Sequence, residues 1–186
     1  MMENRNYNGT IQPSSNGRLV SGYAVRFDEV SKNLGFYEVI AKGAITEETI
    51  ENSDIFALFN HEQDKVLARK LDETLMLELR DDGLFYTFEA PENELGNDLI
   101  DKINQGIINT SSFAFTVNDD DKNSQNWYRS EGKLYRTVKK IERLFDVSPV
   151  FNAAYSTTSC YCRNMIEEDE KVTKKMDELT AQIESL

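Results

Sequence analysis

The chain has 186 residues, a formal net charge of −12 and a pI near 4.6, and 39% of its residues are hydrophobic. This length suits one domain with its own core plus a tail, and the hydrophobic content excludes a wholly disordered chain. The negative charge argues against nucleic acid or an anionic membrane as a partner, and no run of about 18 apolar residues could span a bilayer.

The two cysteines, Cys160 and Cys162, are one residue apart. That spacing is poor for a strain-free disulfide, and two thiols fall short of a metal-binding set. We therefore expect no cofactor or metal, and a reducing compartment such as the cytoplasm.

Residues 1–17 are rich in Asn, Gly, Ser and Pro and are expected to form a disordered lead-in. Beyond them, alternating runs and short apolar runs predict about eight strands. The nine candidate segments for these strands are residues 18–27, 36–40, 55–59, 75–79, 84–89, 107–117, 127–129, 134–137 and 139–149.

Two helices are predicted among these strands. Residues 43–52 form the first, with Thr46 as N-cap, and residues 93–105 form the second, with Gly106 at its C-terminal end. An Asp-Gly pair between residues 75–79 and 84–89 indicates a hairpin. These elements predict a β-rich α+β domain or barrel over residues 18–160.

Residues 163–186 differ from the rest because they are charged, free of Gly and Pro, and follow a seven-residue apolar pattern. We expect an amphipathic helix that pairs with another copy or docks on a partner, since three heptads are marginal alone. The alternative is a helix that packs on its own domain.

Three residues could carry chemistry. His61, the one histidine, follows a buried-strand pattern and opens a polar loop, where catalytic groups are often presented. Ser112, in the pair Ser111-Ser112, begins an apolar strand, but its hydroxyl needs a base to become nucleophilic. Asp146 interrupts an apolar run, on the same face as Leu144 and Ser148 if the strand is regular, and a buried carboxylate must be paired. The alternatives are a structural histidine, serines that bind local backbone groups, and an aspartate on a solvated face.

At these places the chain resembles the prohead proteases of tailed phages, which are related to the herpesvirus assemblins. Ala68 and Thr110 stand where the family usually has glycine, and Asp146 stands where it usually has glutamate. The matching segments, in family order, are GYAVRF at 22–27, KGA at 42–44, LFNHE at 58–62 with VLAR at 66–69, GIINTSSFAF at 106–115, and LFDVSPV at 144–150 with AAY at 153–155.

The resemblance implies a small, mostly antiparallel β-barrel flanked by helices. It also implies a serine endopeptidase with Ser112 as nucleophile, His61 as base and Asp146 as the residue that orients it. Arg69 and Arg143 are candidates for oxyanion or structural support. The implied substrates are scaffold segments, the N-terminal arm of the major capsid protein and the protease itself. The implied setting is the assembling procapsid in the host cytoplasm, with a homodimer or higher oligomer.

Two other functions remain open at this point. A non-catalytic capsid assembly or scaffold protein could keep the fold without the activity. An acidic β domain with a dimerising helix could serve as a binding module with no active site. Reaction with a serine-directed fluorophosphonate separates both from a protease.

Overall fold

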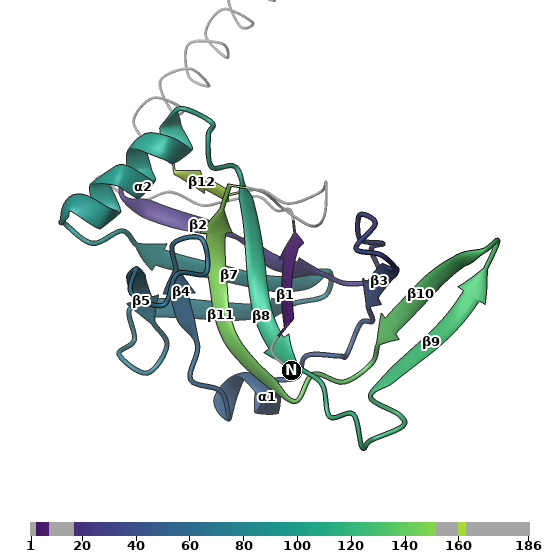
Figure 1. Cartoon of the computed structure of the whole chain (residues 1–186). Helices are drawn as coiled ribbons and strands as arrows, with labels where there is room; N and C mark the ends of the chain where they lie inside the picture. The colour runs from purple at the N-terminus through teal and green to yellow at the C-terminus, as the bar shows by residue number, and fades with distance from the viewer. Residues whose placement is uncertain (1–2, 8–16, 152–159, 163–186) are drawn as a thin grey trace, which may run out of the picture.

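The computed structural model describes residues 3–7, 17–151 and 160–162, and within them the chain forms twelve strands and two helices (Figure 1). The elements are β1 (Glu3–Tyr7), β2 (Leu19–Arg26), β3 (Tyr37–Ile40), α1 (Glu47–Glu51), β4 (Phe56–Leu58), β5 (Val66–Arg69), β6 (Leu75–Arg80), β7 (Gly83–Glu89), α2 (Glu94–Asn104), β8 (Thr110–Thr116), β9 (Gln125–Ser130), β10 (Lys133–Val138), β11 (Arg143–Val150) and β12 (Cys160–Cys162).

The described strands form three sheets. Their orders are β1-β8-β11-β4-β5, β12-β2-β7-β6 and β3-β10-β9. Neighbouring strands are antiparallel except that β4 runs parallel to β11 and β3 runs parallel to β10. None of these three sheets closes on itself, so the predicted barrel is wrong, whereas a mainly β member of the α+β class is confirmed.

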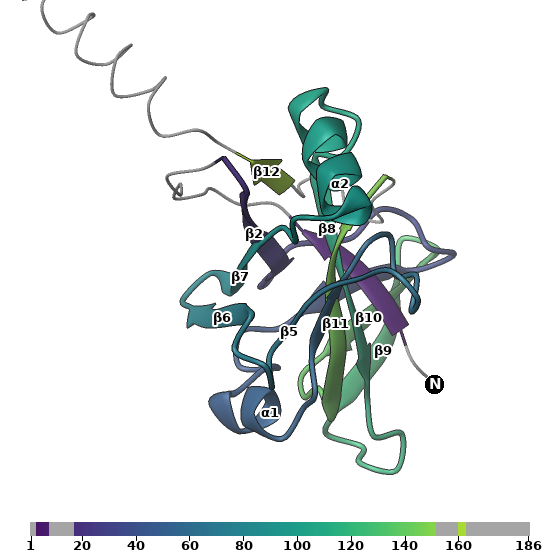
Figure 2. The same cartoon turned by 90° about the vertical axis from the view of Figure 1, so that its left-hand side faces the viewer.

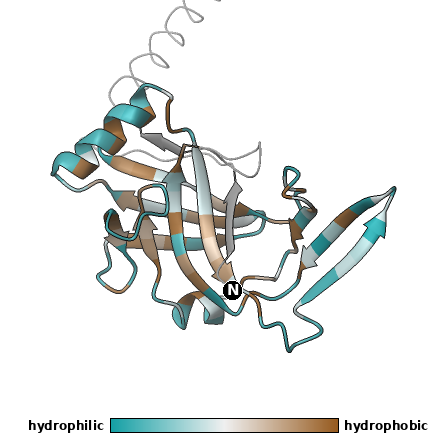
Figure 3. Ribbon diagram, viewed as in Figure 1, coloured by the Kyte–Doolittle hydropathy of each residue, from teal (hydrophilic) through white to brown (hydrophobic). Residues whose placement is uncertain are grey.

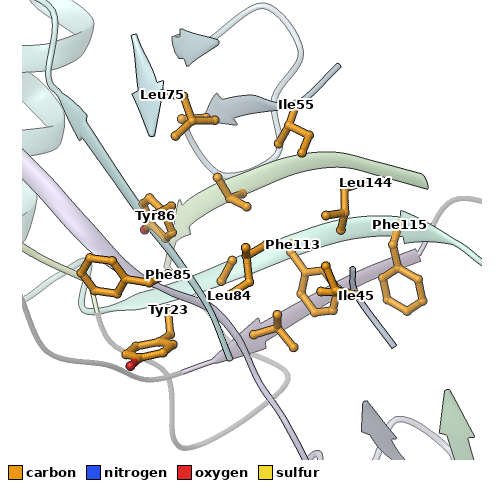
Figure 4. Close-up of a cluster of buried hydrophobic side chains, with 14 of the residues drawn as sticks. Tyr23, Ile45, Ile55, Leu75, Leu84, Phe85, Tyr86, Phe113, Phe115 and Leu144 are labelled. Atoms are coloured by element: carbon orange, nitrogen blue, oxygen red, sulfur yellow. The ribbon is translucent and has the colours of Figure 1, made fainter. Parts of the chain in front are cut away.

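The five-stranded and four-stranded sheets pack face to face, and their strands cross, as two views at right angles show (Figures 1 and 2). The core lies between them, where Leu84 and Tyr86 of β7 meet Phe113 and Phe115 of β8 (Figure 4). Apolar residues gather on these inner strands, whereas the β9–β10 hairpin extends from the body and is more polar (Figure 3). This sandwich gives β8 a rigid position, with one face in the core and the other free to carry a site.

Both helices begin where the sequence predicts. The Thr46 side chain caps α1 by accepting from the Thr49 N–H, and the Asn93 side chain caps α2 by accepting from the Gly96 N–H. Gly106 follows α2 at φ +72°, which suits glycine after a helix end. None of the described helices is long and apolar enough to cross a bilayer.

The β6–β7 hairpin forms as predicted, but its glycine has a different role. The two linking residues are Asp81 and Asp82, and Gly83 is the first residue of β7. A Cβ on Gly83 would lie 2.1 Å from the carbonyl oxygen of Val25 in the neighbouring strand. Glycine is therefore required there for the close approach of β2, and not for the turn.

Several parts of the chain differ from the sequence prediction or lie outside the described residues. Strand β1 lies inside the segment that we expected to be disordered, and β5 and β12 were not predicted as strands. The remaining predicted lead-in residues up to position 16, and the predicted helix at residues 163–186, lie outside the described residues.

Candidate active site

Strand β8 holds its two neighbouring serines on opposite faces. Ser111 lies on the core face, where its hydroxyl hydrogen-bonds the Tyr86 hydroxyl at 2.6 Å. Ser112 lies on the other face and is paired in register with Ser148 of β11. Because side chains alternate along a strand, only Ser112 of this pair can join groups on the outer face of the sheet.

A β-bulge in β11 aims Asp146 at that same face. Leu144 is paired with Phe115, and Asp146 is paired with Ala114, the next residue of β8. Phe145 is therefore an extra residue in β11 that has no partner position in β8. Leu144 consequently enters the core while Asp146 joins Ser148 on the outer face. Our expectation that Asp146 and Leu144 share a face is therefore wrong, because a bulge reverses the alternation.

His61 lies in a tight loop that follows β4. Asn60 and His61 both have left-handed backbone conformations, with φ of 57° and 60°. The Asn60 N–H donates to the Pro149 carbonyl at 3.0 Å, and the Phe59 N–H donates to the Lys65 carbonyl at 3.0 Å. These bonds fix the loop against the end of β11 and hold two residues in a conformation that non-glycine residues seldom adopt.

The three side chains form one hydrogen-bonded chain. Nε2 of His61 hydrogen-bonds Oγ of Ser112, across 51 positions of sequence. Nδ1 of His61 lies 2.6 Å from Oδ1 of Asp146, and the same oxygen accepts a hydrogen bond of 2.6 Å from the Ser148 hydroxyl. An ionised carboxylate only accepts hydrogen bonds, so Nδ1 carries the proton and Nε2 is free to accept the proton of Ser112.

Burial makes this arrangement specific. The side chains of His61 and Asp146 are 18% and 5% exposed. A buried carboxylate is costly unless its oxygens are bonded, and here His61 and Ser148 bond one of them. The sequence placed Ser148 on the same strand face as Asp146, as the structure shows, but assigned Ser148 no role in the site.

The structure does not join either of the two arginines proposed as helpers to the hydrogen-bonded chain of Ser112, His61 and Asp146. Arg69 donates from Nε and Nη2 to the two oxygens of the Asp54 carboxylate, at 3.0 and 2.7 Å. This hydrogen bonding lowers the pKa of Asp54 and raises that of Arg69. Arg143 is paired with Thr116, four residues along β8 from Ser112, or roughly 14 Å. The structure therefore does not bring Arg143 to the hydroxyl.

Within the described residues, no group of three or more His, Cys, Asp or Glu side chains is placed to hold a metal ion. What the site offers is a hydroxyl, a base that can take its proton and a carboxylate that orients the base. This is the arrangement of groups used for acyl transfer through a serine ester. The fold and site thus define a β-rich protein with the groups of a serine hydrolase.

The chain belongs to the caudovirus prohead serine protease family, because the model of that family matches residues 6–174. This confirms the family resemblance and the assignment as a serine protease. The solved bacteriophage T4 capsid assembly protease, gp21, aligns with a TM-score of 0.50 and 15% identity over 82% of this chain and 96% of that chain, which shows a shared fold. A search of curated proteins found no match.

Proposed function

We propose that this capsid maturation protease cleaves scaffold segments, the N-terminal arm of the major capsid protein and itself, inside the assembling procapsid in the host cytoplasm. Membership of the prohead protease family supports the setting. The observation that carries the catalytic part is the hydrogen-bonded chain from Ser112 through His61 to Asp146.

The reaction follows from the direction of these bonds. His61 takes the proton of the Ser112 hydroxyl through Nε2 as the oxygen attacks a peptide carbonyl. Asp146 stabilises the imidazolium that forms and keeps Nδ1 protonated. His61 then gives the proton to the leaving amine, and an ester on Ser112 remains. Water attacks that ester with His61 again as base, which releases the acid product and restores the hydroxyl.

The other parts of the proposal rest on sequence alone. The heptad pattern in residues 163–186 suits attachment to a scaffold or capsid partner, or pairing with a second copy, followed by removal through self-cleavage. We also expect at least a dimer. Intact-mass measurement of wild type beside Ser112→Ala tests the cleavage, because only the wild type should lose this segment.

The catalytic assignment is tested by co-expressing each variant with its capsid protein and following processing on a gel. Ser112→Ala should abolish both processing and labelling by a fluorophosphonate. Ser111→Ala is the matched control because it is the neighbouring serine on the core face, and it should keep both. Labelling that survives in Ser112→Ala would place the nucleophile elsewhere. A wild-type protein that neither reacts nor cleaves would indicate the non-catalytic assembly protein.

A further inference from the structure

The sheet face that carries Ser112 continues sideways across two more strands. Asp146 of β11 is paired in register with Phe56 of β4, and Phe56 is paired with Arg69 of β5. Residues paired across neighbouring strands present their side chains on the same face. The outer face of this sheet therefore runs from the catalytic groups directly onto β4 and β5.

A cavity of about 300 Å³ lies over this part of the sheet, beside the imidazole. Its lining combines two groups of the site with a mainly apolar floor. The lining residues are Asp54, Phe56, Leu58, His61, Gln63, Val66, Phe145 and Asp146. Phe145 is there because it is the extra residue of the bulge that also aims Asp146.

Apolar surface in this cavity is open to solvent. Val66 remains 43% exposed, and Phe56 and Phe145 are only partly buried. Scattered apolar side chains on a protein surface need no explanation, but apolar side chains gathered in a concavity beside reactive groups are typical of a binding site. The volume is at the low end for a ligand pocket, which suits one side chain better than a longer segment.

The charges around the cavity already have partners. Asp54 is held by two hydrogen bonds from Arg69, and Oδ1 of Asp146 accepts from His61 and Ser148. The two carboxylates would repel an acidic side chain that entered the cavity, and a basic side chain would lose its hydration beside carboxylate oxygens that already accept hydrogen bonds. An uncharged apolar side chain would instead displace water from Val66 and the aromatic rings.

We propose that this cavity is the substrate subsite that receives a bulky apolar side chain, aliphatic or aromatic, close to the cleaved bond. It follows that the protease selects its cleavage sites partly by such a residue at one fixed position. This proposal rests on the proposed function, since the cavity adjoins the catalytic groups assigned there. The test below identifies which substrate residue, counted from the cleaved bond, places its side chain in the cavity.

The full-length protease is tested on fluorogenic peptides varied one position at a time with Leu, Phe, Ala, Asp and Lys. Rates are divided by the enzyme fraction that a fluorophosphonate titrates, so that inactive protein does not count. We expect one position at which Leu or Phe raises kcat/KM about tenfold or more over Asp and Lys. If the fluorophosphonate does not react with the wild-type protein, the proposed function is wrong, and the subsite proposal that depends on it is wrong as well.

Val66→Lys locates the preference in the cavity. It should reduce kcat/KM for the Leu or Phe peptide about tenfold and favour Asp at the same position, because the new ammonium attracts a carboxylate. Val30→Lys is the matched control, since Val30 is 55% exposed and does not line the cavity, and it should keep the wild-type preference. If the active wild type prefers an apolar residue at no substrate position, or if Val66→Lys keeps the wild-type preference, the subsite proposal is wrong. The proposed function would stand in either case.

Discussion

Ser148 donates a hydrogen bond of 2.6 Å to Oδ1 of Asp146, the oxygen that also contacts Nδ1 of His61. Ser148 is completely buried and is paired with Ser112 across β8 and β11. The strand register thus places Ser112, the proposed nucleophile, beside the residue that hydrogen-bonds the Asp146 carboxylate. Ser148 acts through Asp146, so its expected role is positioning.

Ser148→Ala should lower kcat/KM about tenfold, because a hydrogen bond to a charged group contributes about 1.5–3 kcal/mol and tenfold corresponds to about 1.4 kcal/mol. Ser148→Thr keeps the donor and should restore most of the rate. His61 is the only histidine, so isotope-labelled histidine reports this ring alone by NMR. The Nδ1 signal should shift in the alanine variant and return in the threonine variant. A loss of stability with an unmoved signal would make Ser148 merely structural.

Asp146→Asn should lower kcat by a factor on the order of 10⁴ while the protein stays folded. The amide introduced by Asp146→Asn can donate a hydrogen bond to Nδ1 of His61, and this favours the imidazole tautomer that carries its proton on Nε2. A protonated Nε2 cannot accept the proton of the Ser112 hydroxyl. Single-turnover rates and circular dichroism measure the two effects. Asp146→Glu keeps the carboxylate and should retain far more activity. Equal losses in both variants would argue against the orienting role.

Gly83→Ala should destabilise the fold by at least about 3 kcal/mol, the upper end of the usual cost of overpacking. Its Cβ would meet the Val25 carbonyl oxygen at 2.1 Å and the Tyr23 ring at 2.9 Å, so β2 or β7 has to move. Gly132→Ala is the control because a Cβ there meets nothing within 4 Å. Its positive φ of 74° should cost about 1 kcal/mol. Denaturant unfolding that ranks the two variants in the opposite order contradicts this account.

The pKa of Asp54 is held below its ordinary value mainly by hydrogen bonding to Arg69. A carboxyl group with a lowered folded pKa contributes stability above its unfolded pKa, and loses it as pH falls through the folded value. Arg69→Gln should therefore raise the Asp54 pKa, as measured by NMR titration of the carboxyl carbon. Both side chains are well exposed, so stability should change little. An unchanged Asp54 pKa would show that Arg69 is not its partner in solution.

Local patterns in the sequence determined most of the individual elements. Thr46 caps α1 as predicted, because a cap depends on residues three positions away, and Asn93, the first residue of the second predicted helix, caps α2. The β6–β7 and β9–β10 hairpins follow from alternation around short turns. The short segment at β5 was missed because four residues give too little pattern to separate a strand from a loop. Motif order along the chain was also enough to indicate the family.

Tertiary structure decided how these elements meet. Pairing of β11 with both β8 and β4 joins distant segments, so the choice of open sheets over a barrel depended on packing between them. The proximity of His61 to Ser112, the bulge at Phe145 and the cavity beside it arise from that pairing. Sequence could name candidate reactive residues because the chemistry of a side chain is local. Only long-range packing could place them within bonding distance, because it depends on the whole core at once.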